Sequence, residues 1–209
     1  MSGGTPLPPT RWALAGPRNG GYADRFAELI ARGEDVVGEA RLADVLVERG
    51  ARILDAGSGI GRIGAYLQAQ GHRVVAAEPD PALVARSRAT YPDLPVLPLE
   101  ILELTPEALA AAGAPTAFDL VVCVGNVLPF VAEGTEVAVL RWLGSLLADG
   151  GRILVGFHLQ AGPASARAYA AEEFLADVDA AGLAVQHRFG GYDLRPVDDR
   201  YAVTILARS

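Results

Sequence analysis

The sequence of 209 residues contains no lysine, since all 18 of its basic residues are arginine. Lysine is the side chain that forms Schiff bases, binds phosphate in glycine-rich loops and acts as a base when its pKa is lowered. Those three chemistries are excluded for this chain. Arginine stays charged at physiological pH, so it binds anions but does not exchange protons.

Cysteine, long apolar runs and blocks of positive charge are also scarce. A single cysteine, Cys123, excludes an internal disulfide and predicts a reducing, cytoplasmic environment. No run approaches the ~20 apolar residues of a membrane-spanning helix. The net charge of −7 without a basic block argues against a nucleic-acid partner. We expect a cytoplasmic protein with no membrane or nucleic-acid partner, present as a monomer or a homodimer.

The N-terminal segment differs in composition from the rest of the chain. It is rich in glycine and proline and lacks the basic and apolar regions of a signal peptide. We predict a flexible tail over residues 1–19. Residues 20–209 are long enough for one domain with a complete core, and residues 20–50 are predicted to form cap helices on it.

Apolar segments of strand length alternate with helical patterns through the rest of the chain. The predicted helices span residues 22–32, 38–48, 60–70, 81–91, 106–112 and 135–147, with a last one ending at 181. The predicted strands span residues 51–55, 73–78, 95–99, 118–124, 152–158, 183–189 and 200–207. This alternation predicts an α/β, Rossmann-like doubly wound sheet with helices on both faces. The last two strands have no helix between them, so they should pair antiparallel at one edge.

A glycine-rich stretch, residues 53–61, follows the pattern of a buried strand, a turn and a helix start. Glycines at alternate positions permit a sharp turn and the close approach of a ligand. The first turn of the following helix offers unpaired N–H groups. This arrangement predicts a site for a nucleotide-like ligand.

Two ligand patterns overlap in that stretch. From Gly59 onward the chain satisfies the dinucleotide motif G-x-G-x-x-G, with Glu78 near the distance of a ribose acid, which would indicate an NAD(P)- or flavin-binding oxidoreductase-like domain. Counted from Gly57, however, the third glycine position holds Arg62. Asp55 would repel a pyrophosphate, whereas it would suit a cationic ligand such as S-adenosylmethionine. These residues favour the cationic ligand, and the dinucleotide stays as the alternative.

Acids also follow the next two predicted strands. In a doubly wound sheet the ligand lies at the carboxyl ends of the strands. Glu78 ends the second predicted strand and can accept hydrogen bonds from two ribose hydroxyls. Glu100 follows the third and can accept one from an adenine amino group, although a solvated loop acid is the simpler interpretation for it.

Four segments in order resemble the motifs of class I S-adenosylmethionine-dependent methyltransferases. These are residues 53–61, 74–80, 118–126 and 147–155. The resemblance extends over roughly residues 20–209. It implies a seven-stranded sheet with order 3-2-1-4-5-7-6 and an antiparallel last strand, together with methyl transfer from S-adenosylmethionine.

The resemblance also implies which residues bind this cofactor. The motif glycines and Asp55 would lie along its methionine part, Glu78 on the ribose and Ile101 beside the adenine. In similar small-molecule methyltransferases an N-terminal tyrosine and arginine hold the carboxylate of the cofactor. The implied cofactor-binding residues are Tyr22, Arg25, Asp55, Gly57, Ser58, Gly59, Gly61, Glu78, Pro79, Glu100, Ile101, Val124, Gly125 and Asn126.

Catalysis of methyl transfer needs few dedicated groups, because alignment and desolvation of the nucleophile do most of the work. The candidate catalytic residue is His158, which ends the fifth predicted strand and can accept a proton near neutral pH. A polar residue facing a loop is the alternative for it. The three histidines lack metal-ligand spacing, so no metal is predicted. We expect a small-molecule acceptor, with a non-catalytic cofactor-binding partner subunit as the alternative function.

Overall fold

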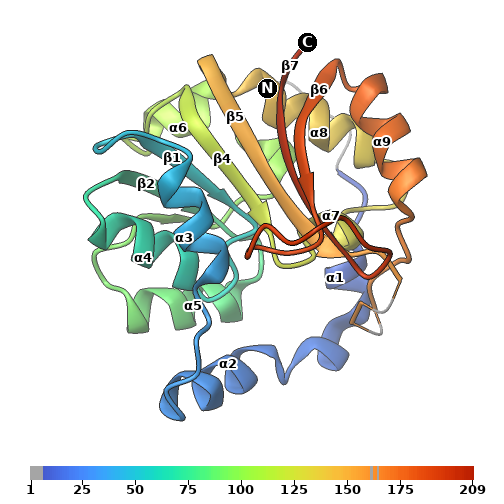
Figure 1. Ribbon diagram of the computed structural model, residues 1–209. Coiled ribbons are helices and arrows are strands. Elements are labelled where there is room, and N and C mark those ends of the chain that lie inside the picture. Colours follow the sequence, from blue (N-terminus) through green and yellow to red (C-terminus); the bar gives the residue numbers. More distant parts are fainter. Residues whose placement is uncertain (1–6, 161, 164) are drawn as a thin grey trace.

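The computed structural model describes residues 7–160, 162–163 and 165–209 (Figure 1). It contains a seven-stranded sheet with the order β3-β2-β1-β4-β5-β7-β6. Strands β1 to β5 pair parallel, while β7 pairs antiparallel with both β5 and β6. The predicted fold class, strand order and antiparallel edge are confirmed.

The strands are β1 (Arg52–Ala56), β2 (Arg73–Ala77), β3 (Val96–Leu97), β4 (Phe118–Val124), β5 (Leu147–His158), β6 (Leu183–Phe189) and β7 (Tyr201–Arg208). The α-helices are α1 (Arg11–Ala15), α2 (Tyr22–Ala31), α3 (Gly38–Val45), α4 (Arg62–Ala69), α5 (Pro81–Thr90), α6 (Pro106–Ala111), α7 (Val127–Phe130), α8 (Glu136–Ser145) and α9 (Ala171–Ala180). Two short 3-10 helices are η1 (Gly16–Asn19) and η2 (Ile101–Glu103).

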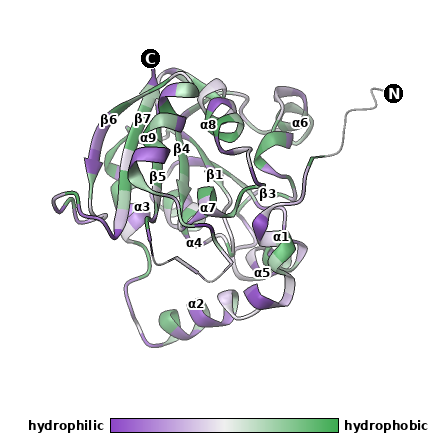
Figure 2. Cartoon of the chain, turned by 90° about the vertical axis from the view of Figure 1, so that its right-hand side faces the viewer, coloured by the Kyte–Doolittle hydropathy of each residue, from purple (hydrophilic) through white to green (hydrophobic). Residues whose placement is uncertain are grey.

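The core lies on both faces of the sheet. Neighbouring residues of a strand point to opposite faces, so Ile53 belongs to one buried cluster and Leu54 to the other. Helices α3, α4 and α5 cover the face of Ile53, and α6, α8 and α9 cover the face of Leu54. The central strands are therefore apolar on both sides, as their largely green colour shows (Figure 2).

Strand β5 begins at Leu147 rather than at the predicted residue 152. Phe118 of β4 pairs with Leu147 and Leu120 pairs with Arg152, so residues 148–151 bulge out of the ladder. Gly150 has a φ of 73° within this bulge. A glycine pair after a helix commonly marks its end, and the helix was predicted to reach residue 147. Here Gly150 and Gly151 belong to the bulge, and α8 already ends at Ser145.

The prediction of a flexible tail over residues 1–19 is wrong for residues 10–19, while residues 1–6 lie outside the described part of the chain. The side chain of Thr10 accepts a hydrogen bond from the Ala13 N–H at 3.1 Å and begins α1. Arg11 donates to the Val131 carbonyl at 2.8 Å and pairs with the buried Glu136 at 3.0 Å. This segment thus packs on the body that was expected to begin at residue 20.

Helices α1 and α2 lie across the end of the sheet at which α7 is found (Figure 1). Every residue of α2 keeps at least partial exposure. Among the described residues no helix combines the length and the hydrophobicity that crossing a membrane requires.

Candidate active site

The turn between β1 and α4 has the sharp backbone that its glycines predicted. Gly57, Gly59 and Gly61 have φ values of 76°, 56° and 81°, a region that side chains other than glycine rarely adopt. The N–H groups of Gly57 and Ser58 both donate to the Ala77 carbonyl, at 2.9 and 3.0 Å. The turn is thereby fastened to the end of β2.

Gly57 is also required by packing. A Cβ atom at this position would lie 2.6 Å from Cγ2 of Val127, the first residue of α7. The close contact brings α7, which follows β4, against the turn that follows β1. The sheet places these two strands side by side.

Asp55 supports the turn from behind. The residue is 2% exposed, and its Oδ2 accepts a hydrogen bond from the Gly64 N–H in α4 at 2.9 Å. Burial raises the pKa of Asp55 to about 7. The carboxylate was expected to face a cationic ligand. In the structure it faces Gly64 and is not among the residues that line the cavity described below. Asp55 shapes the turn that the ligand meets.

Glu78 occupies the position directly after β2. Its Oε2 accepts a hydrogen bond from the Gly59 N–H at 2.9 Å, and its Oε1 accepts one from the Asp80 N–H at 2.9 Å. The residue is 5% exposed, and burial raises its pKa to about 7. Because both oxygens are held by backbone donors, the carboxylate has a fixed orientation at the cavity wall.

Arg62 had been used only to argue against a dinucleotide, yet the structure gives it a definite role. It is 7% exposed, pairs with Glu39 of α3 at 2.5 Å and lies 4.6 Å above the ring of Phe26 in α2. A buried guanidinium is stable only when it is paired in this way. The pair joins the two cap helices to the start of α4, directly after the glycine turn.

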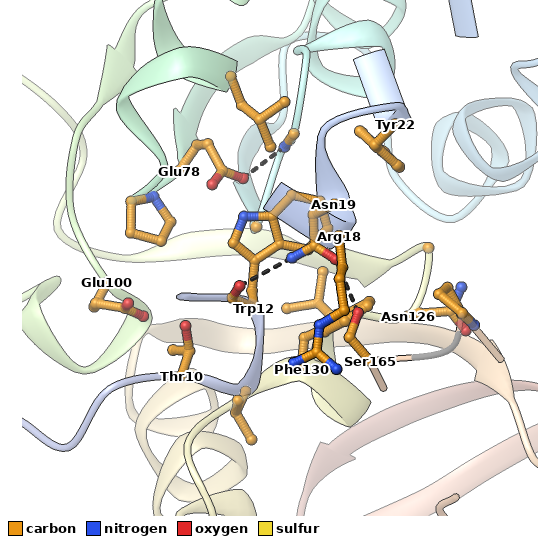
Figure 3. Close-up of a pocket in the computed structure, with 18 of the residues that line it drawn as sticks. Thr10, Trp12, Arg18, Asn19, Tyr22, Glu78, Glu100, Asn126, Phe130 and Ser165 are labelled. Carbon is orange, nitrogen blue, oxygen red and sulfur yellow. Dashed lines mark hydrogen bonds between the residues drawn. The ribbon is translucent and has the colours of Figure 1, made fainter. Parts of the chain in front are cut away.

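A cavity of about 330 Å³ opens at this end of the sheet (Figure 3). Ten of the predicted cofactor residues line it: Tyr22, Arg25, Gly57, Gly59, Glu78, Pro79, Glu100, Ile101, Gly125 and Asn126. The other four, which are buried behind its wall, are Asp55, Ser58, Gly61 and Val124. The remaining lining residues are not among the predicted cofactor residues. They are Thr10, Trp12, Arg18, Asn19, Gly21, Leu83, Val127, Phe130, Val131, Pro163 and Ser165.

Glu100 and Ile101 begin η2 at the side of the cavity near β3. The side chains of Glu100 and Glu103 each accept a hydrogen bond from the other residue's backbone, with 2.9 Å for the Glu100 N–H donating to Glu103. Burial, followed by the nearby Glu103 charge, raises the pKa of Glu100. This acid is thus held in place at the cavity rather than freely solvated.

The N-terminal segment forms the wall opposite the glycine turn. The ring of Trp12 makes edge contacts with Tyr22 at 5.6 Å and with Phe130 at 5.2 Å. Its Nε1–H donates to Asp80 Oδ2 at 2.8 Å, and its carbonyl accepts from Asn19 Nδ2 at 2.9 Å. In the sequence, the only indication that this glycine- and proline-rich segment packs against the body of the protein was its tryptophan, Trp12.

Asn126 and His158 meet at the far side of the same cavity. The backbone N–H of His158 donates to Asn126 Oδ1 at 2.8 Å, and His158 Nδ1 lies 3.0 Å from the same oxygen. Because the backbone N–H of His158 can only donate, the Asn126 atom that it contacts must be the amide oxygen. That oxygen can only accept, so Nδ1 of His158 carries a proton. Burial lowers the pKa of His158, so the neutral ring is favoured.

His158, the candidate catalytic residue, reaches the cavity only through Asn126. Asn126 lines the cavity and His158 does not. The histidine ring packs instead against Tyr201, with ring centroids 4.7 Å apart. His158 can act on bound molecules through Asn126.

The sheet order, the glycine turn and an acid at the end of β2 together define the class I methyltransferase fold. A family model described as "Methyltransferase domain" matches residues 54–153. A TehB-like SAM-dependent methyltransferase from Corynebacterium glutamicum is 32% identical, with a TM-score of 0.79 over 91% of this chain and 98% of that one. No curated protein sequence matches the chain.

Two less similar structures share the fold. The CcbJ methyltransferase from Streptomyces caelestis is 17% identical, with a TM-score of 0.67 over 82% of this chain and 94% of that one. A 1,6-didemethyltoxoflavin-N1-methyltransferase from Burkholderia thailandensis is 20% identical, with a TM-score of 0.62 over 99% of this chain and 93% of that one.

The similarity to the Corynebacterium protein extends over nearly the whole of both chains, and it shows the family. The chain belongs to the class I S-adenosylmethionine-dependent methyltransferases. It is an enzyme that transfers a methyl group from S-adenosylmethionine, and the dinucleotide alternative is not supported. In agreement, the third glycine of the literal dinucleotide pattern, Gly64, lies inside α4 rather than in the turn.

Proposed function

We propose that the cavity is the cofactor site, in which Glu78 holds the ribose, Glu100 and Ile101 hold the adenine, and the glycine turn lines the methionine part. The observation that carries this proposal is how the two carboxylate oxygens of Glu78 are hydrogen-bonded. Each of its oxygens accepts one backbone N–H and keeps a further lone pair, so the carboxylate can also accept from two adjacent hydroxyls. A ribose offers such a pair.

The open space beside Gly125 supports the same assignment. A Cβ atom built on Gly125 would meet nothing within 4 Å, although Gly125 lines the cavity. The backbone at the end of β4 is therefore open to a ligand. Asp55, Ser58, Gly61 and Val124 contribute indirectly, through the shape of the turn and of the strand ends.

Tyr22 and Arg25 are proposed to hold the carboxylate of the cofactor. The Tyr22 hydroxyl lies 3.1 Å from the Cβ position of Gly59, which places α2 over the turn. Burial raises the pKa of Tyr22, so its hydroxyl remains a donor at neutral pH. Arg25 lies one turn further along α2, lines the cavity and has no acid within 4 Å among the described residues.

The methyl acceptor is proposed to be a small molecule. The described part of the acidic chain folds around one sheet, and its cavity is walled by Trp12 and Phe130. The structurally similar Burkholderia enzyme was crystallised with 1,6-didemethyltoxoflavin, which gives one example of a small acceptor on this fold. Nucleic acid and membranes are not expected as partners.

The residues of the chain promote the reaction by orientation and exclusion of water. S-adenosylmethionine supplies an electrophilic methyl group with a good leaving group, so no metal or covalent intermediate is needed. Trp12, Phe130 and Val127 keep the cavity apolar around the reacting atoms. Asn126 orients the acceptor that binds next to it, and His158 holds Asn126 in position.

A cytoplasmic location and a monomeric or homodimeric state are also proposed. The single Cys123 is buried, and burial raises the pKa of its thiol to about 12, so it is an inert core residue. Light scattering after size-exclusion chromatography tests the oligomeric state, and a tetramer would contradict it.

The cofactor proposal is tested by titration calorimetry with S-adenosylhomocysteine and with NADH. The first should bind and the second should not, and binding of NADH alone would overturn the proposal. Glu78→Ala should weaken the binding of S-adenosylhomocysteine by about tenfold or more. The matched control is Glu48→Ala, which changes an exposed acid just before β1, at the end of the sheet opposite the cavity. A screen with methyl-labelled donor then identifies the acceptor.

A further inference from the structure

The cavity has two chemically different ends, which follow from the strand order. Glu78 and Glu100 come from the ends of β2 and β3, on one side of β1. Asn126 follows β4, and Ser165 lies in the loop after β5, on the other side of β1. Figure 3 shows the two acids on the left, Asn126 on the right and Trp12 between them. Both acids of the cavity wall are thus at the cofactor's ribose and adenine end.

The hydrogen bonds already formed at the Asn126 end of the cavity determine which polar groups there are left for a ligand. Asn126 has its oxygen occupied by two donors of His158, so its amide NH₂ is the group left for a ligand. Asn19 donates to the Trp12 carbonyl at 2.9 Å, and its oxygen accepts from the Ser165 hydroxyl at 2.8 Å. The donors of Asn19 and Ser165 are therefore largely used within the protein.

Arg18 is the charged group at this end. Its Nε donates to the Ala15 carbonyl at 3.4 Å, a long contact that leaves the outer guanidinium nitrogens available. Within the described residues it has no acid within 4 Å. Figure 3 shows its guanidinium beside Phe130 and Ser165. The available groups at this end are a cation and an amide donor, with no carboxylate to oppose them.

The aromatic side chains define the rest of this end. Trp12 and Phe130 meet edge to face with centroids 5.2 Å apart, and both line the cavity together with Pro163. Aromatic and proline side chains of this kind pack well against a flat apolar body. The pocket therefore combines aromatic and proline surfaces with donors for one anionic group.

We propose that this end binds a methyl acceptor with a planar apolar body and a carboxylate, which Arg18 pairs with and Asn126 hydrogen-bonds. The inference rests on the proposed function, since it assigns the cofactor's own carboxylate to Tyr22 and Arg25 of α2. Arg18 lies in η1, before that helix, and faces the Asn126 end. A guanidinium and a carboxylate form paired hydrogen bonds that a neutral amide does not replace.

The test uses the full chain saturated with S-adenosylhomocysteine, whose binding is measured first and separately. Benzoate and benzamide then serve as a matched pair of probes, since they share shape and differ in charge. Their affinities are compared by ligand-observed NMR or calorimetry. Benzoate should bind about tenfold more tightly than benzamide. Arg18→Met should abolish this preference, and Arg18→Lys should retain part of it.

The control is Arg73→Met, which removes the same charge at the start of β2, an exposed site at the end of the sheet opposite the cavity. This variant should keep the benzoate preference. Equal affinities of the two probes, or a preference that survives Arg18→Met, would overturn the proposal. So would a loss of S-adenosylhomocysteine affinity in Arg18→Met equal to that in Arg25→Met, because Arg18 would then serve the cofactor. If S-adenosylhomocysteine itself does not bind to the wild type, the proposed cofactor site fails instead.

Discussion

The indole Nε1–H of Trp12 donates to Oδ2 of Asp80 at 2.8 Å, while Oδ1 of the same aspartate caps α5 by accepting from the Ala82 N–H at 2.8 Å. One carboxylate thus joins the N-terminal segment to the helix that follows Glu78. This bond holds the opposite wall of the cavity against the strand ends.

Replacing Trp12 by phenylalanine should therefore loosen the N-terminal segment while keeping an aromatic ring between Tyr22 and Phe130. We expect S-adenosylhomocysteine to bind about fivefold more weakly, the cost of one hydrogen bond. Hydrogen exchange should become faster in residues 10–31 and stay unchanged in β4. Unchanged exchange in residues 10–31 would show that the bond does not hold the segment.

Cofactor binding should depend on pH through Glu78. Burial raises the pKa of this carboxyl to about 7, and accepting from two ribose hydroxyls requires the ionised form. The affinity for S-adenosylhomocysteine should therefore rise between about pH 6 and about pH 8 and then level off. Calorimetry should show that Glu78→Gln binds about tenfold more weakly and without this pH dependence. Asp55→Asn is the control, and it should retain the dependence.

The stability of the protein should fall with rising pH because of Asp55. The pKa of its carboxyl is raised from 3.8 to about 7, so the folded state prefers the proton. The stabilisation is complete below the unfolded value and is lost as the pH rises through about 7. In the Asp55→Asn variant, the side-chain amide oxygen would still accept from the Gly64 N–H without titrating. The difference in free energy of unfolding between wild type and this variant should change by about 2–4 kcal/mol from about pH 4 to about pH 8.

Denaturant titrations at several pH values measure that difference. Glu78 is present in both proteins, so its own titration cancels in the comparison. A difference that does not vary with pH would show that the carboxyl of Asp55 has an ordinary pKa.

The two roles of the glycine turn, conformation and packing, can be separated. Gly57→Ala combines a φ of 76° with a Cβ that would lie 2.6 Å from Val127, and it should lower the free energy of unfolding by about 2–4 kcal/mol. Gly71→Ala has a φ of 89° but open space around its Cβ, so it should cost only about 1 kcal/mol. In the Gly57→Ala background, Val127→Ala should restore part of the loss. Equal costs for the two glycine variants would argue against the contact with α7.

His158 should affect turnover without affecting cofactor affinity. His158→Ala removes the ring that fixes Asn126 Oδ1 and leaves the backbone bond in place. With the acceptor from the labelled-donor screen, we expect kcat to fall about tenfold and the dissociation constant of S-adenosylhomocysteine to stay within about twofold. His187→Ala in β6 is the control, since that histidine is exposed on the edge strand. An unchanged kcat would remove any role for His158.

Local chemistry made much of the fold predictable. Buried parallel strands are continuous apolar runs, and Asp80-Pro81 starts α5 because its aspartate caps the helix and its proline has no N–H to lose. The same is true of Glu78, whose place at the end of β2 follows from the strand pattern alone. The bulge at Gly150 was missed because a glycine pair after a helix is also the usual helix stop.

By itself, the sequence determined the individual strands, the glycine turn and the acids at the strand ends, because each depends on residues close together in the chain. The order of the strands followed from the resemblance to the methyltransferase family. Only the tertiary structure decided which groups meet across the cavity. Asn19 and Ser165 are 146 positions apart and still share a hydrogen bond. Likewise, Asp55 contacts Gly64 and His158 contacts Asn126, and neither lines the cavity, since side-chain direction depends on packing that no local pattern contains.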